Sequence, residues 1–252
     1  MIDPTSDSQF DLRVLYEDSE LLILNKRSGV PSAPHSPDET GTAVEAALHL
    51  CPSLIGVGEK NLEPGLVHRL DTGTSGVLVF AKTQAEFQRL KQIWKDRRVE
   101  KIYRAMTMRD SPLPSLPAQI DYPLAHDAKS KKKMIALLNP KWRHYRGKPI
   151  PALTRILNGF KLGSSELFDL TVQIETGVMH QIRCHLDAWG APIWGDPIYG
   201  KTKPNPIKAP AERLWLHAWK LGFHAAAGHW LEVEAPLPEN WPSSRDPHSL
   251  GR

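Results

Sequence analysis

FDLTVQIETGVMHQIRCHLDAWG, residues 168–190, is the stretch that decides the fold class, because it joins the clearest strand of the chain to a helix. Apolar and polar side chains alternate with a period of two over residues 168–175, as in a strand with one buried face. Apolar side chains then recur at helical spacing up to Gly190, a natural C-terminal cap. The stretch therefore predicts a strand over residues 168–175 and a short helix over residues 179–188.

Short apolar segments on both sides of this stretch predict further strands. They are residues 14–25, 77–80, 102–108, 215–223 and 230–235. The first of these segments holds two strands around a polar turn. Two capping boxes, at Thr42 with Glu45 and at Thr83 with Glu86, predict the starts of two helices. Residues 109–155 are rich in Pro, Lys and Arg and are assigned to no element.

Strands dominate this pattern and do not alternate regularly with helices. Such a pattern is typical of the α+β class, with a mixed, largely antiparallel sheet and flanking helices. No internal repeat and no linker rich in Pro, Gly or Ser divides the chain. We therefore expect a single domain over residues 12–241, between a polar N-terminal segment, residues 1–11, and a polar C-terminal tail, residues 242–252.

The chain has 252 residues, of which 40% are hydrophobic and 24% charged, as in ordinary globular proteins. This composition excludes a wholly disordered protein. No stretch approaches the roughly 18 consecutive apolar residues of a membrane span, and residues 1–10 lack the pattern of a secretory signal. We therefore expect a protein that is not bound to a membrane. Because cysteine is limited to Cys51 and Cys184, we also expect reduced thiols and a cytoplasmic protein.

The net charge of +4 is unevenly distributed along the chain. Residues 1–24 hold one Arg against six Asp and Glu, a net charge of −5, whereas residues 89–155 hold 17 Lys and Arg against five Asp and Glu, a net charge of +12. Aromatic residues lie among these basic ones: Trp94, Tyr103, Trp142 and Tyr145. Basic groups neutralise phosphates and aromatic rings stack on bases, so residues 89–155 predict a nucleic-acid surface. The alternative is a solvated basic face without a function.

The segment HRLDTGTSG, residues 68–76, concentrates chemically active side chains just before a predicted strand. It holds a carboxylate, a guanidinium, an imidazole and three hydroxyls in a loop that also carries glycine. Loops fixed by a rigid scaffold often carry catalytic groups. Asp71 is suited to act as a nucleophile, a general base or a metal ligand. The alternative is a turn residue whose side chain caps local N–H groups.

A second segment of this kind is TGVMHQIRCHL, residues 176–186. His180 and Arg183 are spaced to share one face of the predicted helix, opposite its apolar stripe. The helix dipole disfavours a cation near the N-terminus, so Arg183 is expected to pair with an anion from elsewhere in the chain. A third segment, KIYRA at residues 101–105, places a tyrosine ring between basic neighbours.

Other chemistries have weaker support in the sequence. A metal site is one alternative for four histidines, but they lack the spacing and the cysteine partners of such sites: His68, His180, His185 and His217. We therefore expect no metal. Walker and Rossmann glycine patterns are absent, so we expect no nucleotide cofactor either. Cys184 lies beside an arginine and is an alternative nucleophile, although packing within the helix is the favoured interpretation.

The three segments resemble the motifs of the RluA-type RNA pseudouridine synthases. Residues 68–76 are similar to the HRLDxxTSG motif of that family, residues 101–105 to its KxYxA segment and residues 176–186 to its TGRxHQIRxHL segment. The stretch GAPIWGDPIYG, residues 190–200, follows in a form similar to the family's. The motifs occur in the family's order, and the resemblance extends over most of the chain.

The resemblance implies a pseudouridine synthase-like fold with a central catalytic cleft. It also implies an enzyme that breaks the glycosidic bond of a uridine in RNA, rotates the uracil and rejoins it through C5, without a metal, a cofactor or a redox change. Asp71 would be the catalytic carboxylate, Arg183 the guanidinium that keeps it ionised and oriented, and Tyr103 the ring that packs on the flipped uracil. Arg69, with His68 beside it, would act in base flipping.

The partner that the resemblance implies is ribosomal or transfer RNA, and a monomer is expected. Many relatives carry a small basic RNA-binding domain before the catalytic one, whereas the match here begins near Leu12. We therefore expect the catalytic domain itself to bind RNA through the basic stretch at residues 89–155. The side chains expected to do so are Lys131, Lys132, Lys133 and Arg143.

The sequence departs from the family pattern at Val178, where relatives usually have arginine, and Met179 follows it. We expect this departure to change contacts with RNA or with the scaffold rather than the chemical step. It is also the basis of an alternative function, a catalytically inactive RNA-binding or RNA-chaperone protein with the same fold.

Overall fold

The computed structural model describes residues 6–7, 12–139, 141, 144–163, 165–200 and 213–242. The chain forms two compact units. Unit 1 comprises Met1–Lys101 and His217–Leu237, and unit 2 comprises Ile102–Leu216 and Pro238–Arg252. Each unit is therefore assembled from two separate stretches of the chain.

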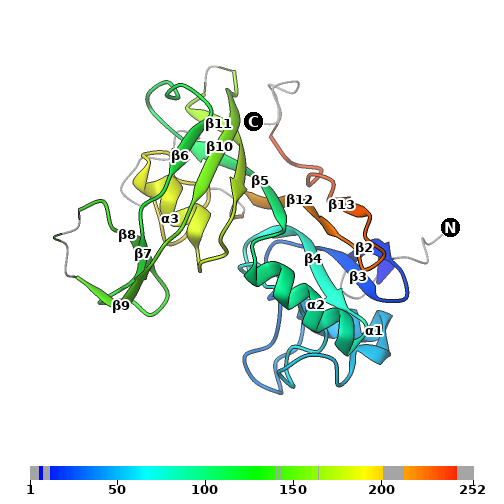
Figure 1. Ribbon diagram of the computed structural model, residues 1–252. Helices are drawn as coiled ribbons and strands as arrows, with labels where there is room; N and C mark the ends of the chain where they lie inside the picture. Colours follow the sequence, from blue (N-terminus) through cyan, green and yellow to red (C-terminus); the bar gives the residue numbers. More distant parts are fainter. Residues whose placement is uncertain are drawn as a thin grey trace. The chain divides into compact units, whose positions relative to one another are not determined.

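Unit 1 is built on strands in the order β1-β2-β3-β4-β12, with β13 paired to β12 (Figure 1). Their bounds are β1 Ser6–Asp7, β2 Leu12–Glu17, β3 Leu21–Lys26, β4 Ser75–Ala81, β12 Leu216–His224 and β13 Trp230–Glu234. The pairings are antiparallel except for β4 with β12, which is parallel. All seven residues of β4 are buried, as the apolar run in the sequence predicts.

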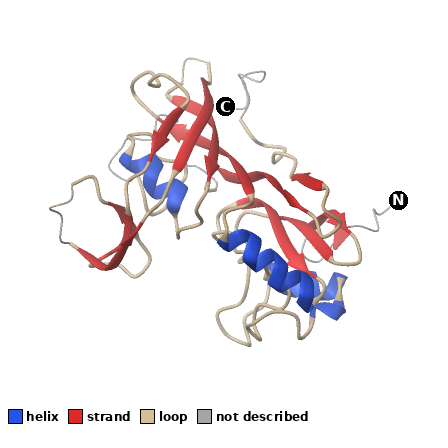
Figure 2. Ribbon diagram, in the orientation of Figure 1, coloured by secondary structure: helices blue, strands red, loops and turns tan. Residues whose placement is uncertain are grey.

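Two α-helices belong to unit 1, α1 at Ala43–Leu50 and α2 at Gln84–Lys95, with a short 3₁₀ helix at Pro52–Leu54. Both predicted N-caps are confirmed, because the hydroxyls of Thr42 and Thr83 accept the backbone N–H groups three residues later. Helix α2 lies along the sheet (Figure 2), and its buried face packs on side chains of β3, β4, β12 and β13.

Unit 2 contains strands in the order β5-β11-β10-β6 and a separate three-stranded sheet in the order β8-β7-β9. Their bounds are β5 Glu100–Met108, β6 Ala118–Ile120, β7 Leu124–Asp127, β8 Met134–Ala136, β9 Tyr145–Ile150, β10 Thr154–Lys161 and β11 Leu167–Ile174. Within the described part of this unit, these strands pair antiparallel. Helix α3, Gln181–Ala188, lies beside β8 and β10 (Figures 1 and 2).

The predicted α+β class, with a mixed, largely antiparallel sheet and flanking helices, is confirmed. Each segment that the sequence predicts as a strand contains one, and residues 109–155, which the sequence leaves unassigned, hold β6 to β9. Helix α3 begins at Gln181 rather than at residue 179. Among the described residues, no helix is long and apolar enough to cross a membrane.

A buried ion pair joins β5 to β11 inside unit 2. The Nε and one terminal nitrogen of Arg104 donate to the two carboxylate oxygens of Asp169, and the indole N–H of Trp241 donates to the same carboxylate at 3.1 Å. The Asp169 side chain is 3% exposed. Burial raises the pKa of Asp169 in spite of the arginine, so the charged carboxylate depends on these donors.

We predict that Arg104→Met lowers the free energy of unfolding by about 3 kcal/mol, because it leaves a buried carboxylate without its counter-charge. Urea denaturation followed by circular dichroism measures this loss. The matched control is Arg155→Met, which breaks a pair with Glu175 in which both side chains are more than a third exposed. That variant should lose less than about 1 kcal/mol. Equal losses in the two variants would contradict the prediction.

Candidate active site

The segment that carries Asp71 forms a tight reversal at the start of β4. The N–H of Val67 donates to the carbonyl of Val79 at 3.1 Å, so the chain runs antiparallel beside β4 before it turns. The N–H of Thr74 then donates to the carbonyl of Asp71 at 2.9 Å, which closes a four-residue turn. Asp71 is therefore the first residue of a hydrogen-bonded turn and is half-buried. The predicted turn geometry is confirmed, and it leaves the catalytic interpretation open.

A buried lysine fixes the next residue of this turn. Lys26, at the end of β3, is 0% exposed, and its ammonium donates to three backbone carbonyls. The acceptors are Arg27 at 2.8 Å, Val30 at 2.6 Å and Thr72 at 3.1 Å. An ammonium buried in this way replaces its water by carbonyl oxygens, so the two loops are tied together.

Further hydrogen bonds join the same two loops. The N–H of Gly29 donates to the carbonyl of Thr72 at 2.8 Å, and the hydroxyl of Ser28 donates to the carbonyl of Gly73 at 2.7 Å. The hydroxyl of Ser32 donates to the carbonyl of Leu70 and accepts its N–H. The backbone on both sides of Asp71 is thus held by the segment that follows β3.

The C-terminal side of the turn is fixed by β12. A Cβ atom on Gly76 would lie 2.1 Å from the carbonyl oxygen of Ala218, so only glycine allows β4 and β12 to approach this closely. Next to it, the buried hydroxyl of Ser75 is 2.8 Å from His217 Nδ1, while His217 Nε2 lies 3.2 Å from the carbonyl of Ala235. Since a carbonyl only accepts, Nε2 carries the proton and Ser75 donates to Nδ1. Ser75 and His217 therefore have structural partners.

His68 packs inside unit 1. Its ring stacks on Trp94 with the centroids 5.4 Å apart, and its Nε2 accepts the N–H of Val79 at 3.3 Å. Burial, with Lys101 and Lys91 nearby, lowers the pKa of His68 to about 3. The imidazole is therefore neutral at physiological pH. This geometry is that of a packed, uncharged ring; the predicted role of His68 in base flipping stays a prediction.

Arg69 and Asp71 lie on the more accessible part of the same segment. The Arg69 side chain is 63% exposed and its Nη1 is 3.6 Å from a carboxylate oxygen of Glu63. Arg69 thus presents a guanidinium to solvent two residues before the Asp71 carboxylate. Unit 1 therefore carries both the carboxylate and the guanidinium that the sequence predicts for this motif.

In unit 2, Arg183 lies in the first turn of α3 and is 4% exposed. Its Nε and one terminal nitrogen bind the two carboxylate oxygens of Asp196 at 2.7 and 2.9 Å. The guanidinium also lies over the ring of Tyr199 at 5.4 Å. The prediction that Arg183 pairs with an anion from outside its helix is confirmed by Asp196, which the sequence analysis did not name. In the sequence, only the family-like stretch GDPIYG, residues 195–200, points to Asp196.

Asp196 is itself held rigidly. Its side chain is 0% exposed, and Oδ1 also accepts the N–H groups of Ile198 at 2.8 Å and Tyr199 at 3.1 Å.

The expectation that Arg183 lies opposite the core is wrong, because α3 is buried on both sides. His180, expected on the same face, caps the helix in a left-handed conformation with φ of 55°. The guanidinium of Arg183 is held in one orientation by its bidentate bond to Asp196.

The remaining polar residues of the helix also bind the scaffold. Gln181 donates to the carbonyl of Leu153 at 2.9 Å and accepts the hydroxyl of Thr176 at 2.7 Å. His185 is bonded through Nδ1 to Thr154 and through Nε2 to the carbonyl of Tyr122, both at 2.9 Å. Burial lowers the pKa of His185, so this ring is neutral too. Both side chains therefore position the helix.

The thiol of Cys184 packs in the core, as the favoured interpretation predicts. It is 3% exposed, and burial raises its pKa to about 12. A thiol with that pKa is protonated at neutral pH and is not a nucleophile. Val178, the departure from the family motif, is partly buried against a cluster that includes Leu124 and Tyr199, whereas Met179 is 39% exposed. Val178 thus serves packing in unit 2.

Tyr103, the third predicted catalytic residue, lies in β5 opposite Val172 of β11 and is half-buried. Its neighbour Arg104 is committed to the buried pair with Asp169, and Lys101 is 7% exposed. The two basic residues that flank Tyr103 are therefore part of the scaffold. Trp94, expected among the aromatic residues of the basic stretch, packs on His68 in unit 1.

The predicted RNA-binding lysines lie on the turn between β7 and β8. Lys131 and Lys132 are exposed. Lys133 is partly buried, with its ammonium 5.5 Å from the centre of the Tyr199 ring. Arg143 lies outside the described residues. Within the described part of the chain, no group of three His, Cys, Asp or Glu side chains is arranged to hold a metal ion.

The lowered pKa of His68 predicts a pH dependence of stability. The unfolded chain binds a proton at His68 below its ordinary pKa of 6.5, whereas the folded chain does so only near 3. Stability from this group is therefore complete above pH 6.5 and decreases as the pH falls towards 3. We expect His68→Gln to remove up to about 2 kcal/mol of this loss at pH 5, measured by urea denaturation at several pH values. Parallel pH profiles for the variant and the wild type would refute it.

Comparison with known proteins assigns the chain to a family. A family model described as RNA pseudouridylate synthase matches residues 20–188, which include all three motifs. Ribosomal large subunit pseudouridine synthase D of Nitrosomonas europaea is 34% identical over 235 residues, which cover 91% of this chain and 63% of that protein. An uncharacterized RNA pseudouridine synthase of Chloroflexus aurantiacus is 38% identical over 215 residues, 85% of this chain and 62% of that protein.

The chain thus spans less than two thirds of the length of these two curated relatives. A solved structure, human RNA pseudouridylate synthase domain containing 1, superposes with a TM-score of 0.71. It is 24% identical, and the superposition covers 92% of this chain and 85% of that one. This likeness confirms the predicted pseudouridine synthase-like fold. The matched motifs, the extent of the match and the fold agree: the chain belongs to the RNA pseudouridylate synthase family.

Proposed function

We propose that this protein is an RNA pseudouridine synthase, which isomerises uridine to pseudouridine in structured RNA. The observation that carries the proposal is the presence of Asp71, Tyr103 and Arg183 at the matching positions of the three family motifs, within a chain of that family. One relative, that of Nitrosomonas europaea, is named a ribosomal large subunit pseudouridine synthase, which supports ribosomal RNA as the substrate, with transfer RNA as the other candidate.

Asp71 is proposed as the catalytic carboxylate. It would attack the anomeric carbon of the uridine or otherwise assist cleavage of the C–N glycosidic bond, and the released uracil would rejoin through C5 while C5 loses its proton. The turn that begins at Asp71 is fixed by Lys26 and by the approach of β4 to β12, which supports a role that needs a stationary carboxylate. The reaction balances without an external oxidant or reductant.

Tyr103 and Arg183 are proposed to serve the same reaction. Tyr103 would pack on the uracil and help to remove the C5 proton, while Arg183 would keep the Asp71 carboxylate ionised and oriented. A guanidinium carries five N–H groups, so a bidentate bond to Asp196 does not exhaust its donors. The loop at residues 68–76, here called the motif loop, carries Arg69 with its side chain exposed. Arg69 would take the place of the flipped base in the RNA stack, with His68 supporting the loop.

The proposal extends to the setting of the enzyme. RNA is its partner, and we propose a monomer of the cytoplasm whose catalytic domain spans residues 12–241. The exposed Lys131 and Lys132 support an RNA-binding role for the turn between β7 and β8. Lys133 and Arg143 complete the RNA-binding set that the sequence predicts. No cofactor enters the proposed reaction.

A catalytically inactive RNA-binding protein on the same fold is the second candidate. The observation in its favour is Val178, which stands where relatives usually have arginine and packs in unit 2. We favour the enzyme because all three catalytic positions are kept. RNA binding with a steep salt dependence and no pseudouridine in any RNA would favour the second candidate.

We predict that Asp71→Asn abolishes pseudouridine formation while RNA binding changes less than about threefold, since the substitution removes a charge and keeps the size of the side chain. Total RNA is incubated with each protein and new pseudouridines are mapped. The control is Asp38→Asn, which changes a carboxylate in the exposed loop between β3 and α1. Identical maps from wild type and Asp71→Asn would show that the assignment is wrong.

We also predict unequal roles for the three consecutive lysines. The double variant Lys131→Gln, Lys132→Gln should reduce the slope of log Kd against log salt by about two, because each exposed lysine contributes about one phosphate contact. Lys133→Gln should change the slope by less than half as much per residue, since its ammonium is engaged with the Tyr199 ring. Filter binding over a salt series measures both. An unchanged slope in the double variant would remove this turn from the RNA surface.

A further inference from the structure

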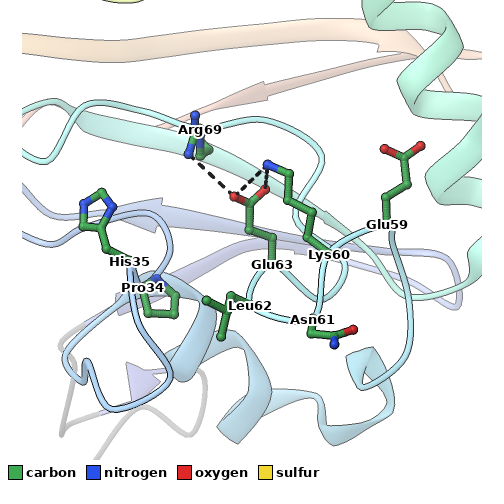
Figure 3. A pocket seen from close by; sticks show the side chains of 8 residues that line it. All are labelled: Pro34, His35, Glu59, Lys60, Asn61, Leu62, Glu63 and Arg69. Atoms are coloured by element: carbon green, nitrogen blue, oxygen red, sulfur yellow. Dashed lines mark hydrogen bonds and ion pairs between the residues drawn. The ribbon is translucent and has the colours of Figure 1, made fainter. Parts of the chain in front are cut away.

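A surface pocket of about 430 Å³ lies in unit 1 beside the motif loop (Figure 3). It is lined by Pro34, His35, Glu59, Lys60, Asn61, Leu62, Glu63 and Arg69. The volume is within the range of pockets that hold a small ligand. Arg69, in its wall, is two residues from Asp71, so the Cα atoms of the two lie within about 7 Å. The pocket is therefore lined by a residue of the same short segment that carries the proposed catalytic carboxylate.

The end of the pocket near Arg69 holds two cations around one carboxylate. Both oxygens of Glu63 are 3.1 Å from Lys60 Nζ, and one is 3.6 Å from Arg69 Nη1 (Figure 3). The side chain of Glu63 is 19% exposed, whereas those of Lys60 and Arg69 are each 63% exposed. Figure 3 shows Glu59 apart from this group. The two cations thus face solvent with one negative charge between them.

The carboxylate is carried by a rigid backbone. The N–H of Glu63 donates to the carbonyl of Lys60 at 3.0 Å, and the carbonyl of Glu63 accepts the N–H of Leu66 at 3.1 Å. Gly65, which follows closely, donates to Val57 and accepts from Ala81, both at 2.8 Å. This loop is consequently tied to β4, and Glu63 holds its place while the exposed ends of Lys60 and Arg69 can change partner.

We propose that this pocket is a subsite for a nucleotide of the RNA next to the target uridine, and that Glu63 is the counter-charge that the RNA phosphate replaces. The phosphate would be bound by Lys60 on the solvent side of Glu63, while Arg69 turns from Glu63 to the RNA stack, so that both cations exchange the carboxylate for the RNA. The base would lie against Pro34 and His35 on the opposite wall, which Figure 3 shows across from Glu63.

This inference rests on the proposed function, because Arg69 and Asp71 link the pocket to the reaction. The mixture of groups supports a nucleotide over an apolar ligand. Cations suit a phosphate, while the amide of Asn61 and the ring of His35 offer donors and acceptors that a base edge requires. In the absence of RNA, Glu63 restrains the two cations. RNA must therefore compete with the Glu63 carboxylate for Lys60 and Arg69.

Two substitutions with opposite expected effects test the subsite. Binding of a short hairpin RNA that contains uridine is measured over a salt series for the full chain. Lys60→Gln should weaken binding three- to tenfold near 0.1 M salt and reduce the salt slope by about one. Glu63→Gln should strengthen binding about threefold, because it releases both cations for the RNA. Thermal unfolding of each variant confirms that it is folded.

The matched controls are Lys220→Gln and Glu234→Gln, which make the same charge changes in another ion pair of unit 1, with 3.0 Å between the two groups. They should bind RNA within twofold of wild type. If Lys60→Gln and Glu63→Gln behave like these controls, the subsite is refuted, whether or not the wild type forms pseudouridine. If the two variants shift binding as expected but the wild type modifies no uridine in total RNA, the proposed activity fails and the subsite stands.

Discussion

The buried ammonium of Lys26 is the contact on which the geometry of the motif loop depends. It donates to carbonyls of the segment after β3 and to the carbonyl of Thr72. A buried charge is tolerated only when several acceptors surround it, so neither loop can move without exposing an unsatisfied group. Asp71 precedes Thr72 in the chain and therefore inherits this restraint. A reaction that needs a fixed carboxylate benefits from a scaffold of this kind.

Unit 2 uses the same principle with the signs reversed. Asp196 is a buried carboxylate satisfied by two backbone N–H groups and by Arg183, and the orientation of the guanidinium follows from that set. In each unit, a buried charged group that does not belong to the proposed reacting set positions one that does. The polar residues of α3 that bind Leu153, Thr154 and Tyr122 hold the helix that carries Arg183.

Much of this architecture is predictable from local sequence, because the signals are local. Alternation in β11 and the hydroxyl caps at Thr42 and Thr83 report burial and hydrogen bonding within a few residues. The partner of Arg183 was predictable as an anion but not as Asp196, since the two are joined only by tertiary structure. Burial of Lys26 was not predictable, because its acceptors come from two loops. Strands β1 and β6 to β10 were missed, because β1, β6, β7 and β8 have only two to four residues and at least half of the residues of β9 and β10 are exposed.

The composition of unit 1 has a consequence for the way the protein is synthesised. Its core contains side chains of β3, β4 and α2 together with Leu221, Phe223 and Val233 from the end of the chain. More than a hundred intervening residues, Ile102–Leu216, belong to unit 2. As the nascent chain leaves the ribosome, unit 1 therefore begins before unit 2 but is completed only after Ile102–Leu216 have been synthesised, and its apolar surface stays exposed until β12 and β13 emerge. Until then, the edge of β4 at Gly76, which pairs with Ala218 of β12 in the folded protein, is an unpaired strand edge that a chaperone or a premature partner strand can bind.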